Sequence, residues 1–476
     1  GTNGKDGADG KDGEKGKSAY EIFKEYYPDY KGTEKEWITD IAKGNNCKLF
    51  GHNISDWIVD KQPTATYPGS KHKECTVCKI VLETAEIPAI GYSEGLIYEM
   101  NADNKTCTVT GVEDVTMEEI LVPSKSPNGY AVTAIGDNAF ENCAASSIII
   151  QNGIKTIGTR AFYNCVNITE IHIPSSVTRI GTQIFYKASN LTTVYYDASY
   201  GSKDNQFLAV SNIKKVVFGG NGVPNYVAYK VTNLTDVEIS GSVKSIGDSA
   251  FYGCSGLTSV TIPDSVTSIY SSAFYGCSGL TSVTIPDSVT SIRGEVFYGC
   301  RGLTSITIPD SVTSIDNSAF YGCRGITSVT FGSGLKSISS DAFFGCSNIE
   351  NIYITDLTAW CKISGLYNLM IYCSTDEKLY LNNELVIDLV IPDNVTLIGE
   401  YAFSGCTGLK SVTIPDSVTS IGSHAFYDCT DLTSVTIPDS VTSIGSHAFS
   451  SCGSLMSIDV SENNSVYYSN NNCLIK

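Results

Sequence analysis

Four residues near the N-terminus have the types and spacing of a metal site. Cys75 and Cys78 are separated by two residues, and Cys47 and His52 lie about 25 residues upstream of them. Two such pairs can hold one zinc ion in a closed tetrahedral site. The same cysteines could instead form a disulfide or remain free thiols. The sequence therefore leaves three alternatives here, and zinc is the one cofactor that it suggests.

One short motif imitates a catalytic site. Gly91–Gly95 matches the Gly-x-Ser-x-Gly pattern of hydrolases, with Ser93 as the nucleophile. That motif needs a strand before it and a helix after it, whereas the strand-like segment Leu96–Tyr98 follows here. We therefore predict that Ser93 is not a nucleophile and that the protein is not an enzyme.

Ten of the 17 cysteines recur at one position of a repeated sequence, with a spacing of 22 or 23 residues along most of its length. They are Cys143, Cys165, Cys254, Cys277, Cys300, Cys323, Cys346, Cys406, Cys429 and Cys452. Each stands between apolar residues, so we expect a buried column of reduced thiols. A fixed period of 20 to 50 residues is typical of a solenoid, in which each unit buries its apolar face against its neighbours.

The unit at Ser249–Ile269 shows how one coil should fold. Val260-Thr261-Ile262 predicts a short strand with two side chains on one face, and Pro263 ends it because proline cannot donate to a sheet. Val266–Ile269 predicts a second extended piece. Ala250-Phe251-Tyr252 predicts about one helical turn, closed by Gly253. Each coil should thus add one strand to a parallel sheet and place the helical turn opposite.

The repeat resembles the BspA-like, or TpLRR-type, leucine-rich repeat of bacterial surface proteins. Its pattern, Leu-x-x-Ile-x-Ile-Pro-x-x-Val-x-x-Ile-Gly-x-x-Ala-Phe-x-x-Cys, is nearly reproduced at Leu409–Cys429. The resemblance covers residues 95–476 and implies about 14 coils. An insertion at about 355–375 interrupts them, and Asp356–Cys361 predicts a short helix there, packed on the flank of the solenoid. The family implies adhesion to host or microbial surfaces.

Three smaller modules should precede the repeats. The expected divisions are a collagen-like glycine-rich linker at 1–17, a helical hairpin at 18–44, a small β-rich Cys/His module at 45–94 and the repeat domain at 95–476. Capping boxes at Ser18/Glu21 and Thr33/Glu36 should open the two helices, and apolar residues such as Ile22, Phe23, Trp37 and Ile38 should pack them together.

Composition restricts the partners. The net charge of −18 disfavours nucleic acids and anionic membranes, which would repel the chain. The sequence contains no run of 18 apolar residues, the length that a helix needs to span a bilayer. We expect a monomer, and a processed or truncated form of a secreted or surface protein that continues beyond Lys476.

Repeated polar residues on the coils have simple explanations. His424 and His447 occupy the same place in adjacent coils and could share a metal, but exposed positions suffice to explain them. The aspartates that follow each strand proline, such as Asp264 and Asp287, favour turns. Neither set requires an ion.

Outward strand residues suggest where a ligand binds. In the regular coils they repeat a Ser-x-Thr pair, as at Ser259 and Thr261, with no aromatic anchor and no charge. In earlier coils Tyr195, Lys215, Asp236 and Glu238 replace this pair, with Glu170 and His172 nearby. We predict that these four residues contact a protein or glycan partner. The alternatives are a structural spacer that displays another domain and, with less support, an enzyme.

Overall fold

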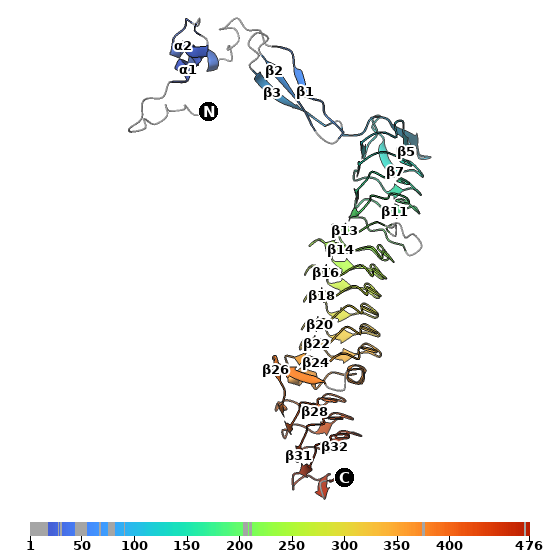
Figure 1. Cartoon of the computed structure of the whole chain (residues 1–476), viewed down its shortest axis with the longest axis vertical. Coiled ribbons are helices and arrows are strands. Elements are labelled where there is room, and N and C mark those ends of the chain that lie inside the picture. Colours follow the sequence, from blue (N-terminus) through green and yellow to red (C-terminus); the bar gives the residue numbers. More distant parts are fainter. Residues whose placement is uncertain are drawn as a thin grey trace. The chain divides into compact units, whose positions relative to one another are not determined.

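The computed structural model describes most of the chain, in two compact units (Figure 1). The described residues are 18–26, 28, 31–42, 55–65, 68–74, 81–89, 91–202, 208, 212–373, 377–470 and 473–476. The first unit ends at Gly91 and the second begins at Tyr92, a few residues before the expected start at residue 95. In the described part, no helix is long and apolar enough to cross a membrane.

The first unit contains two helices and an antiparallel sheet with the strand order β1-β2-β3. The elements are α1 (Ala19–Tyr26), α2 (Glu34–Ala42), β1 (Ile58–Lys61), β2 (Gly69–Glu74) and β3 (Val81–Ile87). The four candidate zinc ligands lie outside the described residues: Cys47, His52, Cys75 and Cys78. The collagen-like linker at 1–17 also lies outside them.

Both helices begin at the predicted capping boxes. The Ser18 hydroxyl accepts a hydrogen bond from the Glu21 amide at 3.2 Å, and the Glu21 carboxylate accepts one from the Ser18 amide at 2.7 Å. Thr33 and Glu36 make the same two bonds at α2. These reciprocal bonds satisfy amides that have no partner within the helix, which fixes where each helix starts.

The packing of α1 with α2 differs from the prediction. The Phe23 and Trp37 rings stack with centroids 5.2 Å apart, and Tyr20 lies 5.6 Å from Trp37. Ile22 and Ile38, which we expected in this contact, are about half exposed. Helices this short present few side chains to each other, and the large aromatic rings cover most of that area.

The second unit is a solenoid of about 15 turns built on two ladders of parallel strands (Figure 1). The first ladder contains β6 (Glu119–Val122), β8 (Ser147–Ile150), β10 (Glu170–Ile173), β12 (Thr193–Tyr196), β13 (Lys215–Phe218), β14 (Asp236–Ile239), β16 (Ser259–Thr261), β18 (Ser282–Thr284), β20 (Ser305–Ile308), β22 (Ser328–Phe331), β24 (Asn351–Ile354), β25 (Lys378–Leu381), β27 (Asp388–Val390), β29 (Ser411–Thr413), β31 (Ser434–Ile437) and β33 (Ser457–Val460). Hydrogen bonding divides it into the sheets β6-β8, β10-β12-β13-β14, β16-β18, β20-β22-β24-β25 and β27-β29-β31-β33, and β26 (Glu384–Leu385) adds to β25.

The second ladder consists mostly of two-residue strands. They are β5 (Thr106–Val112), β7 (Ala131–Ile135), β9 (Thr156–Ile157), β11 (Arg179–Ile180), β15 (Ser245–Ile246), β17 (Ser268–Ile269), β19 (Ser291–Ile292), β21 (Ser314–Ile315), β23 (Ser337–Ile338), β28 (Leu397–Ile398), β30 (Ser420–Ile421) and β32 (Ser443–Ile444). Antiparallel strands pair with the ladders at two places: β4 (Leu96–Met100) on β5, and β26 on β25. The hairpin of β34 (Tyr468–Asn470) with β35 (Cys473–Ile475) forms a separate two-stranded sheet.

The remaining side of each coil is a run of tight turns, which fits the predicted single helical turn. The Tyr252 amide bonds to the Ser249 carbonyl and the Cys254 amide to the Phe251 carbonyl, three residues back in each case. Ser249 and Gly253 have positive φ values of 52° and 71°, which stop the helix from continuing. The Phe251 amide bonds to Ala273 in the next coil at 2.8 Å, so these turns also form a ladder.

Phenylalanine rings fill the core along these turns. Within each continuous run of coils, neighbouring rings stack with centroids 5.1 to 5.8 Å apart, and the rings from Phe140 to Phe426 are fully buried where described. The next residue forms a second, partly exposed stack from Tyr229 to Phe344, with spacings of 4.4 to 4.8 Å. This outer stack was not predicted from the sequence.

The repeat cysteines form the predicted buried column. The described repeat cysteines are free thiols, and most are fully buried. Each thiol in the regular coils donates to a main-chain carbonyl of the preceding coil, as from Cys300 to Phe274 at 3.1 Å. Burial raises the pKa of the thiols from Cys254 to Cys346, and at Cys300 it lies well above the usual value. The cysteine is therefore a weak hydrogen-bond donor as well as a small apolar side chain.

The insertion forms part of the stack of coils. The prediction that it packs on the flank of the solenoid is therefore wrong. The two short helices of the insertion are α4 (Leu357–Trp360), capped by Asp356 as predicted, and α5 (Tyr367–Met370). Trp360 is buried and donates to the Ala402 carbonyl at 2.7 Å. Ser364 pairs with Ser337, and the Cys361 carbonyl accepts from the Gly399 amide at 3.0 Å. The insertion thus carries the second ladder from β23 to β28.

Glu377, at the end of this insertion, is an unusual buried acid. Glu377 is 2% exposed, and its Oε2 has no hydrogen-bond partner among the described residues. Burial, with a smaller contribution from the negative charge of Asp428, raises the pKa of Glu377 from 4.5 to about 8. The folded chain therefore favours the protonated acid at neutral pH.

We expect Glu377 to make the solenoid less stable as the pH rises. Because its pKa is higher in the folded than in the unfolded chain, its contribution to stability is fully present below about pH 4.5 and is lost as the pH rises to about 8. Glu377→Gln cannot ionise, so its melting temperature should exceed that of the wild type increasingly between about pH 5 and about pH 8. Thermal unfolding followed by circular dichroism measures this difference. A difference that does not change with pH would contradict the assigned pKa.

We expect Cys300→Ala to lower the free energy of unfolding by about 1–2 kcal/mol, because it removes buried sulfur contacts and the bond to Phe274. Urea denaturation measures this, and Ser278→Ala, at the exposed position that follows Cys277, is the control. A reducing agent should leave the wild-type midpoint unchanged. A midpoint that falls on reduction would instead indicate disulfides between coils.

Candidate binding surface

The outward face of the first ladder is uniform in the regular coils. The exposed side chains of β16 and β18 are Ser259, Thr261, Ser282 and Thr284, and register places each serine beside a serine and each threonine beside a threonine. Hydroxyl groups cover this surface without aromatic rings or charges. A partner bound there could slide from one coil to the next, because each offers the same contacts.

Four earlier strands break this uniformity. The in-register pairing of β10, β12, β13 and β14 arranges their outward side chains in two columns. The columns are Glu170, Thr193, Lys215 and Asp236, followed by His172, Tyr195, Val217 and Glu238. We call these eight residues the charged cluster. All four residues predicted to contact a ligand belong to it.

Lys215 is the centre of the charged cluster. Its ammonium group lies 3.5 Å from the Asp236 carboxylate and forms a shorter, hydrogen-bonded ion pair with Glu238. The hydrogen bond to Glu238, followed by the charges of both carboxylates, raises the pKa of Lys215. These side chains are partly or largely exposed, so the ion pairs orient them while they remain accessible to solvent. Two acids and one base give this end of the cluster a net negative charge.

Tyr195 contacts the other end of the charged cluster. Its hydroxyl donates to the Glu170 carboxylate at 3.5 Å, and its ring lies edge-on to His172 with centroids 6.3 Å apart. Tyr195 is 38% exposed, whereas the phenylalanine rings of the core are fully buried. Its position and hydroxyl suit it as an anchor for a partner.

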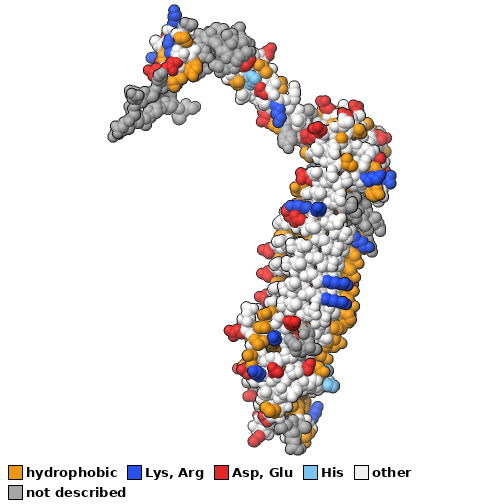
Figure 2. Space-filling model, viewed as in Figure 1, with side chains coloured by type: hydrophobic (Ala, Val, Ile, Leu, Met, Phe, Trp, Pro, Cys, Tyr) orange, Lys and Arg blue, Asp and Glu red, His pale blue; other side chains and the backbone are white. Residues whose placement is uncertain are grey.

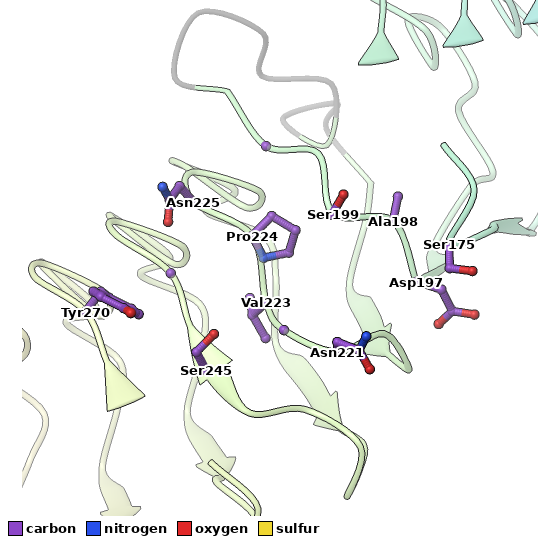
Figure 3. A pocket seen from close by; sticks show the side chains of 13 residues that line it. Ser175, Asp197, Ala198, Ser199, Asn221, Val223, Pro224, Asn225, Ser245 and Tyr270 are labelled. Carbon is purple, nitrogen blue, oxygen red and sulfur yellow. The ribbon is translucent and has the colours of Figure 1, made fainter. Parts of the chain in front are cut away.

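His172 connects the charged cluster to a hollow. Its Nε2 lies 2.7 Å from the Asp197 carboxylate, directly after β12. Asp197 lines a hollow of about 500 Å³ with Asn221, Ser245 and Tyr270 (Figure 3). This volume lies within the roughly 300–1,000 Å³ typical of small-ligand sites. The hollow could not be predicted from the sequence, because its lining comes from five successive coils, from Ser175 to Tyr270.

A second outward surface has a different character. Tyr353 on β24 and Tyr380 on β25 stack with ring centroids 4.6 Å apart. Close by in the chain, the apolar side chains of Leu385, Ile387 and Val390 are between 39% and 63% exposed. Figure 2 shows hydrophobic side chains near β26. This pair could have been predicted from the sequence in the same way as Tyr195, because both tyrosines occupy the outward position that is threonine in the regular coils.

The comparisons with known proteins agree with this architecture. The family model described as a BspA type leucine rich repeat region, present in six copies, matches residues 125–225, 221–350 and 374–475. This chain belongs to the BspA-type leucine-rich repeat family. The family predicted from Leu409–Cys429, and the solenoid that it implied, are thereby confirmed.

Several solved structures are similar to this BspA-type chain. A leucine rich cell surface protein from Faecalibacterium prausnitzii A2-165 is 26% identical, covering 78% of this chain and 94% of its own, with a TM-score of 0.34. A leucine-rich repeat protein from Bacteroides ovatus ATCC 8483 is 22% identical over the same shares, with a TM-score of 0.37. TpLRR of T. pallidum is 20% identical, covering 54% of this chain and 88% of its own, with a TM-score of 0.24. No curated protein sequence matches the chain.

The other candidate residues serve the BspA-type scaffold. Ser93 is 4% exposed, and its hydroxyl accepts from the Leu121 amide at 2.7 Å, so the Gly91–Gly95 motif attaches the chain to the first coils. His424 and His447 stack with centroids 4.9 Å apart, in the adjacent coils where we expected them. Among the described residues, no group of three or more acidic, histidine or cysteine side chains is arranged to hold a metal.

Proposed function

We propose that this protein is a secreted or cell-surface adhesion protein of a bacterium, whose repeat domain binds a protein or glycan on a host or microbial surface. The observation that carries the proposal is the charged cluster. It is an aligned group of aromatic and charged side chains on a ladder whose outward residues are otherwise mostly serine and threonine. Recognition in one register needs such a distinct set of contacts.

The chemistry of the cluster suits selective binding. Partly exposed ion pairs contribute little stability, so Lys215, Asp236 and Glu238 can exchange contacts with a partner at small cost. Charges of this kind chiefly set the association rate and the selectivity. Tyr195 adds an aromatic surface with a polar tip, the type of residue that often carries most of the binding energy.

Charge also restricts the class of partner. The chain has 50 acidic and 32 basic residues, so polyanions such as nucleic acids are poor candidates. A partner with basic or neutral hydrogen-bonding groups fits the carboxylates of Glu170, Asp236 and Glu238. We propose that the protein binds as a monomer and does not insert into a membrane.

Two other roles have less support. An enzyme would need a nucleophile or an acid–base pair in a pocket, and Ser93, the one motif-based candidate, is occupied by main-chain bonds. A spacer that displays another domain would need no distinct surface on its strands. The N-terminal modules fit the adhesion proposal as a stalk that presents the repeats.

Replacing Tyr195, Lys215, Asp236 and Glu238 together by serine or threonine should lower affinity at least tenfold, about 1.4 kcal/mol, for the surface partner. The change extends the Ser/Thr pattern of the neighbouring coils, so the fold should be retained. The assay is binding of the whole chain to immobilised host matrix proteins and to intact bacterial cells.

The matched control replaces Ser282, Thr284, Ser305 and Thr307 by alanine on the regular coils, and it should bind as the wild type does. The reverse result would place the site on those coils. Loss of binding only in a Tyr353→Ser, Tyr380→Ser variant would place it at the second surface. A spacer predicts that none of these variants changes binding.

A further inference from the structure

The hollow beside the charged cluster is lined by polar residues and glycines, together with the apolar residues Ala198, Val223 and Pro224. Asp197, Ser199, Asn221, Asn225 and Ser245 provide carboxylate, hydroxyl and amide groups around it (Figure 3). Together they can both donate and accept hydrogen bonds within one small space. A ligand for such a site must carry many hydroxyl or amide groups of its own.

Tyr270 provides the one aromatic ring of the lining. Asp197 and Tyr270 lie at opposite ends of the hollow in Figure 3. The Arg293 guanidinium lies 4.7 Å from the ring centroid of Tyr270, from the coil that follows. This cation covers one face of the ring and restricts its movement.

The other face of Tyr270 points toward a coil with no side chain at the matching position. Ile246 pairs with Ile269. The residues that follow them, Gly247 and Tyr270, therefore occupy matching positions in adjacent coils. A Cβ at Gly247 would lie 2.4 Å from the Asn225 side-chain oxygen, so only glycine fits there. Because the close approach of Asn225 requires glycine at position 247, no side chain from that position covers this face of the Tyr270 ring. Tyr270 is 36% exposed.

Asp197 is held in place as an acceptor. Its Oδ2 bonds to His172, which fixes the side chain, and an ionised carboxylate has capacity for further donors. Asn225 is also fixed, because its side-chain oxygen accepts from the Asp248 amide at 2.8 Å. Asn221, labelled in Figure 3 on the same side of the hollow as Asp197, is exposed and can turn toward a ligand.

We propose that this hollow binds a short neutral segment of a surface glycan, more than one sugar unit long. The C–H face of one sugar ring stacks on Tyr270, and the hydroxyl groups of a neighbouring unit donate to Asp197 and bond to Asn221. The Asp197 carboxylate and the net charge of −18 disfavour sialic acids and sulfated sugars. The inference rests on the proposed binding function and names the ligand class of one part of that surface.

The test uses the intact chain and an array of neutral, sialylated and sulfated oligosaccharides, followed by titration of the best neutral oligosaccharide. We expect neutral hexose or N-acetylhexosamine glycans to bind. Tyr270→Ala should lower the affinity at least tenfold, whereas Tyr270→Phe should stay within about twofold because it keeps the ring. Asp197→Asn should weaken binding at least about threefold. Saturation-transfer NMR should show the strongest signal on ring C–H protons of one sugar face, and this signal should vanish in Tyr270→Ala.

Tyr130→Ala is the matched control, since Tyr130 is similarly exposed but lies outside the hollow. It should bind sugars as the wild type does, and thermal unfolding should confirm that every variant is folded. Absence of neutral-sugar binding, unchanged binding in Tyr270→Ala, or a preference for acidic glycans would overturn the inference. If neutral sugars fail to bind while cell and matrix binding persists, only this inference fails. If the intact chain binds neither, the proposed function fails as well.

Discussion

The main-chain hydrogen bonds between successive coils are the constraint on which the rest of this solenoid depends. Both strand ladders and the turns bond in register to the next coil, so residues about 23 positions apart become neighbours. A side-chain choice repeated in the sequence thereby becomes a continuous column in space. Phenylalanine, cysteine and tyrosine columns all arise in this way, and each contact is strengthened by an identical one on either side.

The same constraint separates stability from recognition. Inward columns must remain apolar and close to constant in volume, because a void in one coil removes contacts from two neighbours. Outward positions meet no such demand. Regular coils therefore repeat Ser-x-Thr, whereas β10 to β14 carry Glu170, His172, Tyr195, Lys215, Asp236 and Glu238 on an unchanged core. Breaks in the repeat, at the hollow near Asp197 and at the insertion beside the stacked Tyr353 and Tyr380, are the places where surface chemistry becomes distinctive.

Prediction from the sequence was most successful where an interaction is local or repeated. The capping bonds of Ser18 and Thr33 involve residues three apart, and the buried cysteines follow from their position in every coil. It was least successful where the contacts are distant and occur once. Ile22 and Ile38 are exposed although their spacing suggested packing, and Trp360 is buried inside the stack through a bond to Ala402, 42 residues away.

The amino-acid sequence by itself determined the family, the 23-residue coil, the inward and outward faces of each strand and the residues that depart from the Ser-x-Thr pattern. These follow from periodicity, which each coil expresses through its own neighbours. Only the tertiary structure decided that Tyr195 contacts Glu170, that Lys215 joins two acids, and that Asp197, Asn221 and Tyr270 surround one hollow. Those contacts depend on how far each irregular coil is shifted relative to its neighbours. A periodic sequence pattern does not contain this information, because the irregular segments do not repeat.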